Sequence, residues 1–238
     1  MAAARAESPL TYTIVLVASL IAVAHAAIFV RMADADPLVT AAYRMLIASA
    51  VLLPVAAVTA RQEITRLNKR EWRLIGWAAV FLALHFASWI ASLDFTSMAG
   101  GILFVGFLLL AEAARRTIGI VAFVTLVYSG AAILLWAAVL ALDLPVVGLS
   151  LETYLAFIGL GLVSQIIGHT GFNWAVRAIS PMVLALLFLT EPLLSTALGW
   201  FYFGEGFARE TGIGGVLILS AIYLGVRARG TPIAEQTG

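Results

Sequence analysis

Two histidines with matching neighbours are the first candidates for chemistry in this sequence. His85 is followed four residues later by Trp89, and His169 is followed at the same distance by Asn173. The segments LHFASWIASLDFTSM and GHTGFNWAVRAISPM also reach a methionine thirteen residues after the histidine in both cases. A neutral imidazole can donate one hydrogen bond and accept another, and an indole face attracts ammonium groups. The pattern is typical of a polar and aromatic binding site for a small molecule.

Each histidine belongs to a polar stripe if its segment is α-helical. One predicted helix face combines His85, Ser88, Trp89 and Ser92. The other carries Gln165, His169 and Asn173 at positions i, i+4 and i+8. Both segments are otherwise apolar, and polar groups that face lipid are costly, so the stripes should face protein or water. One interpretation is hydrogen bonding between helices alone. The other is a substrate cavity with aromatic walls from Trp89 and Trp174.

Two charged residues, Glu191 and Arg44, lie well inside apolar segments and away from their ends. Glu191 is followed by Pro192, which removes a backbone hydrogen bond and lets a helix kink or open. A carboxylate within a membrane indicates a functional site by default. The sequence leaves three roles open for Glu191, namely proton coupling, binding of a substrate ammonium group, or a structural pair with Arg44. Arg44 is either that partner or a side chain that extends to the outer interface.

Catalytic and cofactor motifs are missing from the sequence. It contains no cysteine, no GxSxG or HExxH motif and no phosphate-binding glycine-rich loop. We therefore expect a protein that is not an enzyme, uses no cofactor or metal and does not bind nucleic acid. A membrane sensor without transport activity is an alternative, although no long loop supports a signalling domain.

The composition indicates an integral membrane protein. Hydrophobic residues make up 63% of the chain and charged residues 11%, and the mean hydropathy is +1.04. Soluble domains carry about 25% charged residues. Eight apolar stretches approach the length of about 20 residues that spans a bilayer. They lie at approximately 12–31, 38–60, 72–93, 98–114, 118–142, 152–177, 181–203 and 210–226. The expected fold class is an all-α, multi-pass helical bundle in contact with lipid.

Basic residues predict the orientation of the spans. With the N-terminus inside, eleven lysines and arginines fall in inner segments, whereas Arg31 and Arg209 fall outside and Arg44 lies within a span. Because inner loops are enriched in basic residues, we expect both termini to be cytoplasmic, in the inner membrane of a bacterial cell.

The two histidine segments run in opposite directions under this topology. Opposed repeats are typical of transporters, which bind substrate near the membrane midplane between two halves. We expect a truncated first repeat at 1–99, a second repeat at 100–229 and a disordered tail at 230–238.

Two longer segments resemble a known family. HAAIFVRMADADPLVTAAYRMLIASAVLL and ISPMVLALLFLTEPLLSTALGWFYFGEGFARETGIGGVLILSAIYLGV are similar to the first and last parts of EamA-like members of the drug/metabolite transporter superfamily. The resemblance includes the pairs Ser180-Pro181, Glu191-Pro192 and Gly204-Glu205.

The family pattern has ten spans in two inverted halves, and this sequence lacks segments that resemble the fourth and fifth. GILFVGFLLLAEAARR resembles the sixth helix and follows directly on the start of a fourth. We therefore expect a break or a distorted connection between about Ala99 and Ile102.

The resemblance implies a transporter that exports small metabolites by alternating access through a central cavity. The polar and aromatic cavity residues favour amino acids as substrates. An exporter of drugs or quaternary amines is the alternative, favoured by a cavity that is mainly aromatic and acidic. Coupling to protons is open.

Overall fold

A computed structural model describes residues 8–92, 99–204, 212–217 and 219–220, and all regular structure within them is helical. Expectations for the predicted tail at 230–238 therefore lie outside the described residues. The helices are α1 (Pro9–Met32), α2 (Pro37–Thr59), α3 (Arg61–Thr65), α4 (Lys69–Ser92), α5 (Ala99–Arg115), α6 (Ile120–Ala141), α7 (Leu151–Gly159), the π-helix η1 (Leu160–His169), α8 (Thr170–Ala175), α9 (Pro181–Phe188) and α10 (Glu191–Phe203).

The helix starts follow from local sequence. Three of them combine a capping side chain with proline in the first turn, where the missing N–H costs nothing. The side chains of Ser8, Asp36 and Ser180 accept hydrogen bonds from first-turn N–H groups of α1, α2 and α9, respectively. Gly204 ends α10 with a φ of 66°, a left-handed conformation that favours glycine.

Six helical segments within the described residues are long and apolar enough to cross a membrane. They correspond to six of the eight predicted stretches, at Pro9–Met32, Pro37–Thr59, Lys69–Ala91, Ile120–Ala141, Leu151–Ala175 and Pro181–Phe203. The stretch predicted at 98–114 forms α5, with 17 residues. About half of the stretch at 210–226 lies outside the described residues, and the described part, 212–217 and 219–220, is helical. The chain is thus an all-helical, multi-pass bundle, and the count of eight spans stays a prediction, as do the inverted repeats and the orientation.

The expected discontinuity after the third span is wrong for the residues it named. Helix α5 begins at Ala99 and continues without interruption through Ile102 to Arg115. Glycine is a weak helix former, but the apolar residues that follow Gly100 and Gly101 pack on α4 and hold this segment helical. The residues immediately before it, 93–98, lie outside the described residues.

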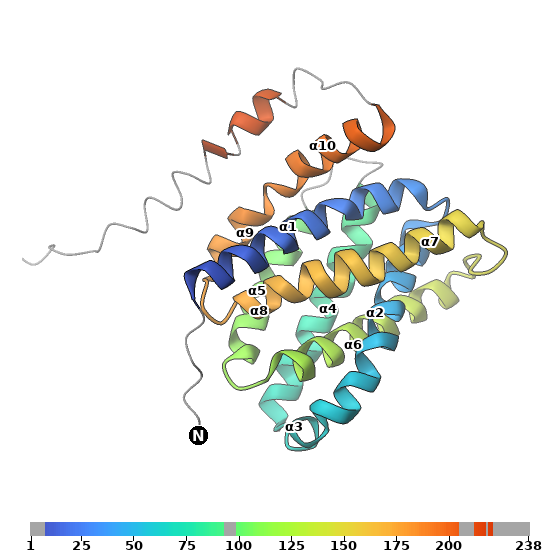
Figure 1. The fold of residues 1–238 in the computed structure, drawn as a ribbon. Coiled ribbons are helices and arrows are strands. Elements are labelled where there is room, and N and C mark those ends of the chain that lie inside the picture. Colours follow the sequence, from blue (N-terminus) through green and yellow to red (C-terminus); the bar gives the residue numbers. More distant parts are fainter. Residues whose placement is uncertain (1–7, 93–98, 205–211, 218, 221–238) are drawn as a thin grey trace, which may run out of the picture.

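Packing places the segments 151–175 and 9–32 side by side. Figure 1 shows α7, η1 and α8 continuing one another alongside α1, with α10 on another side of α1. Glycine permits this close approach, because a Cβ added at Gly168 would lie 2.6 Å from Cγ2 of Val23. Small residues at helix contacts are typical of membrane bundles. Helix α2 packs on α6 and η1, and α4 packs on α5 and α6.

Two irregularities interrupt the spans, and both lie next to polar residues. Residues 160–169 form a π-helix instead of the α-helix that the polar stripe assumed. The span at 181–203 is also discontinuous, because α9 ends at Phe188 and α10 begins at Glu191. Non-helical backbone at membrane depth is tolerated where protein buries it or where it lines a cavity.

Candidate functional site

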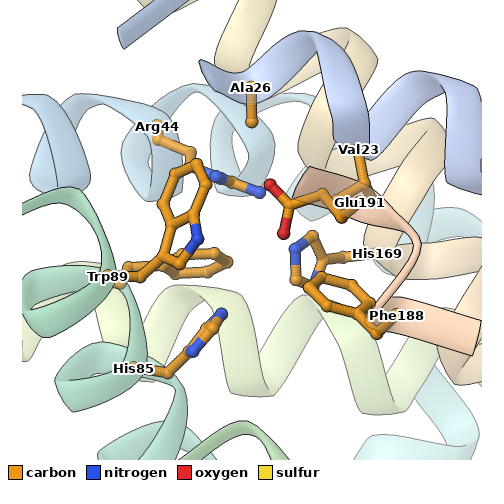
Figure 2. Close-up of a pocket in the computed structure, with 9 residues that line it drawn as sticks. Val23, Ala26, Arg44, His85, Trp89, His169, Phe188 and Glu191 are labelled. Carbon is orange, nitrogen blue, oxygen red and sulfur yellow. The ribbon is translucent and has the colours of Figure 1, made fainter. Parts of the chain in front are cut away.

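Six helical elements meet at one narrow pocket. Figure 2 shows Arg44 from α2, His85 and Trp89 from α4, His169 from η1, Phe188 from α9 and Glu191 from α10 around the same space. Val23 and Ala26 of α1 and Phe86 of α4 complete its wall. We call this space the narrow pocket, and it has no room for a water molecule.

The two matched histidines approach each other in the bundle. Both are 2% exposed, and their ring centroids are 6.1 Å apart. The Phe104 ring lies 5.0 Å from His85 and 5.6 Å from His169, and Phe86 packs edge-on against His169 at 5.0 Å. The structure therefore brings His85 and His169 into one aromatic cluster, and their function there remains a prediction.

Arg44 is held in place from two sides and is only 1% exposed. Its Nε donates to Oε1 of Gln165 at 2.8 Å, and its Cζ lies 3.9 Å from the centroid of the Phe86 ring. Its Nη2 has no hydrogen-bond partner among the residues that the structure describes. A buried cation with an unused donor is expensive unless a negative group compensates it.

When it is ionised, Glu191 supplies that negative group. It is the first residue of α10 and is 5% exposed. The Arg44 guanidinium points toward the Glu191 carboxylate in Figure 2, and the two groups attract each other electrostatically. The break between α9 and α10 places this carboxylate at the helix start, where anions are favoured.

Half of the buried side-chain atoms that lack a hydrogen-bond partner among the described residues lie on the π-helix or on α8, which continues it. Gln165 and Asn173 have no exposed surface, and His169 has 2%. The Asn173 Nδ2 donates to the His169 carbonyl at 2.9 Å and to the Tyr128 hydroxyl at 3.3 Å. The atoms without a hydrogen-bond partner among the described residues are Ser164 Oγ, Gln165 Nε2 and His169 Nδ1 of the π-helix and Asn173 Oδ1 of α8. Thus His169 is the residue of the predicted stripe that lines the narrow pocket. Gln165 accepts a hydrogen bond from Arg44, and Asn173 donates one to Tyr128.

Two predicted site residues lie elsewhere. The Ser88 hydroxyl donates to the His85 carbonyl at 3.1 Å, back onto its own helix, and Ser88 does not line the narrow pocket. The Trp174 ring packs on Tyr12, with centroids 4.7 Å apart, and lies outside the pocket. Phenylalanines form the aromatic wall that the sequence predicted from Trp174.

A larger cavity adjoins the narrow pocket. It has a volume of about 440 Å³ and is lined almost entirely by apolar atoms of α4, α5, α9 and α10. Its walls include Trp89, Phe104 and Phe188, and its only charged lining residue among those described is Glu191. Four residues line both spaces, namely His85, Trp89, Phe188 and Glu191. We call this larger space the apolar cavity.

The sequence did not single out Phe104, Phe188 or Tyr128. Phenylalanines in an apolar helix give no signal that separates a cavity wall from a lipid-facing surface, and only the packing distinguishes them. The described residues hold no cluster of three histidines, aspartates or glutamates that could ligate a metal.

A helical membrane bundle with a ligand-sized cavity beside buried charges is typical of membrane proteins that bind small molecules. The chain belongs to the EamA-like transporter family, whose sequence profile matches residues 95–227. It is also similar to an "Uncharacterized transporter" of Archaeoglobus fulgidus, with 32% identity over 75 residues. That match covers 32% of this chain and 28% of the relative. No solved structure matches the chain. The family indicates a membrane transporter and not an enzyme.

Proposed function

We propose that this transporter exports small amines with an apolar body. The observation that supports this proposal is the apolar cavity, in which Glu191 is the charged lining residue and aromatic rings form the walls. A carboxylate in an apolar setting favours a cation, and an indole face contributes about 0.5–2 kcal/mol toward a bound ammonium group. This is the aromatic and acidic cavity that favours the drug or quaternary-amine alternative.

Amino acids, the first expectation from the sequence, are the second candidate. Arg44 supports them, because its Nη2 has no partner and a substrate carboxylate would provide two acceptor oxygens. However, Arg44 lines only the narrow pocket, which is closed in this structure. An amino acid would therefore have to open that pocket, whereas an amine reaches Glu191 directly from the apolar cavity.

Alternating access between two inverted repeats is the proposed transport mechanism. The break before Glu191 and the π-helix at 160–169 supply two segments whose backbone can change conformation at the site. Movement of one half against the other would expose the apolar cavity to each side in turn. Glu191 would release a proton when the amine binds and regain it after export.

Counterflow in proteoliposomes tests the proposal. Vesicles loaded with unlabelled phenethylamine should accumulate labelled phenethylamine faster than matched phenylalanine vesicles accumulate labelled phenylalanine. Empty liposomes provide the background. Faster phenylalanine exchange would favour the amino-acid alternative. Binding of phenethylamine without exchange would favour a sensor.

The Glu191→Gln variant separates coupling from binding. If Glu191 both binds the ammonium group and carries the coupled proton, as proposed, exchange of phenethylamine should fall at every pH and the residual exchange should no longer depend on pH. If it carries the proton without binding the amine, exchange should survive without its pH dependence. If the carboxylate only binds the ammonium group, exchange should fall at every pH. A variant that keeps both the exchange rate and its pH dependence would show that Glu191 has a structural role beside Arg44.

A further inference from the structure

The ring of Phe188 lies between the apolar cavity and the charged groups of the narrow pocket. On the cavity side it contacts Phe104, with ring centroids 4.1 Å apart. On the pocket side it contacts His169, at 5.5 Å. Phe104 lines only the cavity and His169 lines only the pocket. The Phe188 ring therefore forms part of the wall that both spaces share.

We propose that Phe188 is a specificity-determining residue, which selects amines over amino acids by screening Arg44 from the apolar cavity. The inference rests on the proposed transport of a small amine and deepens it. A ligand in the apolar cavity contacts Glu191 but cannot reach Arg44 or His169 while the phenyl ring is in place. The apolar cavity of the wild-type transporter thus offers a carboxyl side chain to an ammonium group and keeps the Arg44 guanidinium from a carboxylate.

The other shared residues cannot provide the same selection. His85 and Glu191 are polar, so a ligand carboxylate or ammonium group can interact with them directly. Trp89 offers a π face, which attracts cations and has little effect on where a carboxylate can go. Phe188 offers an apolar ring on the wall between the apolar cavity and the pocket that Arg44 lines, so a carboxylate that leaves water to lie against this ring gains no hydrogen bond.

The position of Phe188 in the chain also suits this role. It is the last residue of α9, directly before the break that precedes Glu191. It is half-buried, and its ring also packs edge-on against Phe172, with centroids 5.2 Å apart. These contacts hold the Phe188 ring between the two spaces. The break between α9 and α10 follows directly and is the point where the span can change direction.

Phenethylamine and phenylalanine test the inference, because they differ only by a carboxylate. In Phe188→Ala, removal of the ring should join the two spaces, and the exchange ratio of phenylalanine to phenethylamine should rise about tenfold, the effect of one charge-assisted contact. Phe188→Trp should leave this ratio at or below the wild-type value. Leu186→Ala enlarges the apolar cavity without touching the narrow pocket. It should leave the ratio unchanged. An unchanged ratio in Phe188→Ala, or an equal rise in Leu186→Ala, would overturn the inference.

If neither phenethylamine nor phenylalanine is exchanged, the proposed function is rejected. A chemical probe can then still test whether Phe188 screens Arg44. Phenylglyoxal is an apolar reagent that modifies arginine, and mass spectrometry can follow its reaction with Arg44. Phe188→Ala should accelerate modification of Arg44 about tenfold. The exposed Arg66 should react at the wild-type rate. Equal Arg44 rates in both proteins would show that Phe188 does not screen the guanidinium. Phe188→Leu serves if the alanine variant does not fold, with a smaller acceleration expected.

Discussion

At the scale of single residues, the sequence predicted aromatic cavity walls from both Trp89 and Trp174, but the structure gives the two side chains different surroundings. Trp89 lines both spaces of the site, whereas Trp174 packs on Tyr12 outside them. We expect Trp89→Ala to reduce phenethylamine exchange by about 2- to 30-fold, the equivalent of a cation–π contact worth about 0.5–2 kcal/mol. Trp174→Ala should leave the exchange rate near that of the wild type. Equal losses in the two variants, measured by counterflow at matched protein content, would remove Trp89 from the substrate site.

His85 gives a second prediction at this scale. His85→Ala should lower exchange several-fold without reducing the amount of folded protein, because the imidazole lines both spaces. His169→Ala should have a smaller effect, since His169 lines only the narrow pocket. Size-exclusion chromatography in detergent provides the folding control. If His169→Ala proves the more harmful substitution for amine exchange, substrate reaches the narrow pocket in the wild type.

The Arg44–Gln165 hydrogen bond gives a third prediction at the scale of single residues. Gln165→Leu removes the acceptor at 2.8 Å and leaves a buried guanidinium with fewer partners. The free energy of unfolding should fall by about 1–3 kcal/mol, the cost of an unsatisfied buried polar group. Gln165→Glu keeps an acceptor oxygen and should lose less stability. Titration of the purified protein with SDS in mixed micelles measures both losses. A glutamate variant as unstable as the leucine variant would contradict this account of Arg44.

At the scale of helices, the sequence predicted where most spans lie but not how they are built. Continuous apolar runs and Ser-Pro or Asp-Pro caps are local signals, so the six long segments follow from them. A π-helix has no comparable signal, because it depends on how Gly161 and Gly168 fit against α2 and α1. The rotation of a helix also depends on such packing. The residues of the polar stripe therefore face different neighbours. His169 lines the narrow pocket, Gln165 contacts Arg44, and Asn173 contacts Tyr128.

Close packing of η1 on α1 leads to a prediction about glycine. A Cβ at Gly168 would lie 2.6 Å from Cγ2 of Val23 and 3.1 Å from its backbone nitrogen, so the helices must separate to admit it. Gly168→Ala should lower the free energy of unfolding by about 1–3 kcal/mol, the usual cost of overpacking. Gly76→Ala provides the matched control, since no atom lies within 4 Å of its added Cβ and alanine favours a helix. SDS titration should therefore find the control variant at least as stable as the wild type.

At the scale of the whole molecule, the distribution of basic residues predicts which ends of the bundle face the cytoplasm. Arg66 lies in the connection between α2 and α4, and Lys69 is the first residue of α4. Residues 143–150 lie between α6 and α7. Because basic residues are retained inside, the first connection should be cytoplasmic and the second should be outside. The chain contains no cysteine, so single cysteines can report on each loop without a background. An impermeant thiol reagent applied to intact cells should label a cysteine at Gly148 and leave one at Lys69 unlabelled until the membrane is permeabilised. Gly148 has a φ of 78°, so a cysteine at Val147 serves as a second outer probe without that strain. Labelling at Lys69 in intact cells would reverse the orientation, and the direction proposed for transport would have to be reconsidered with it.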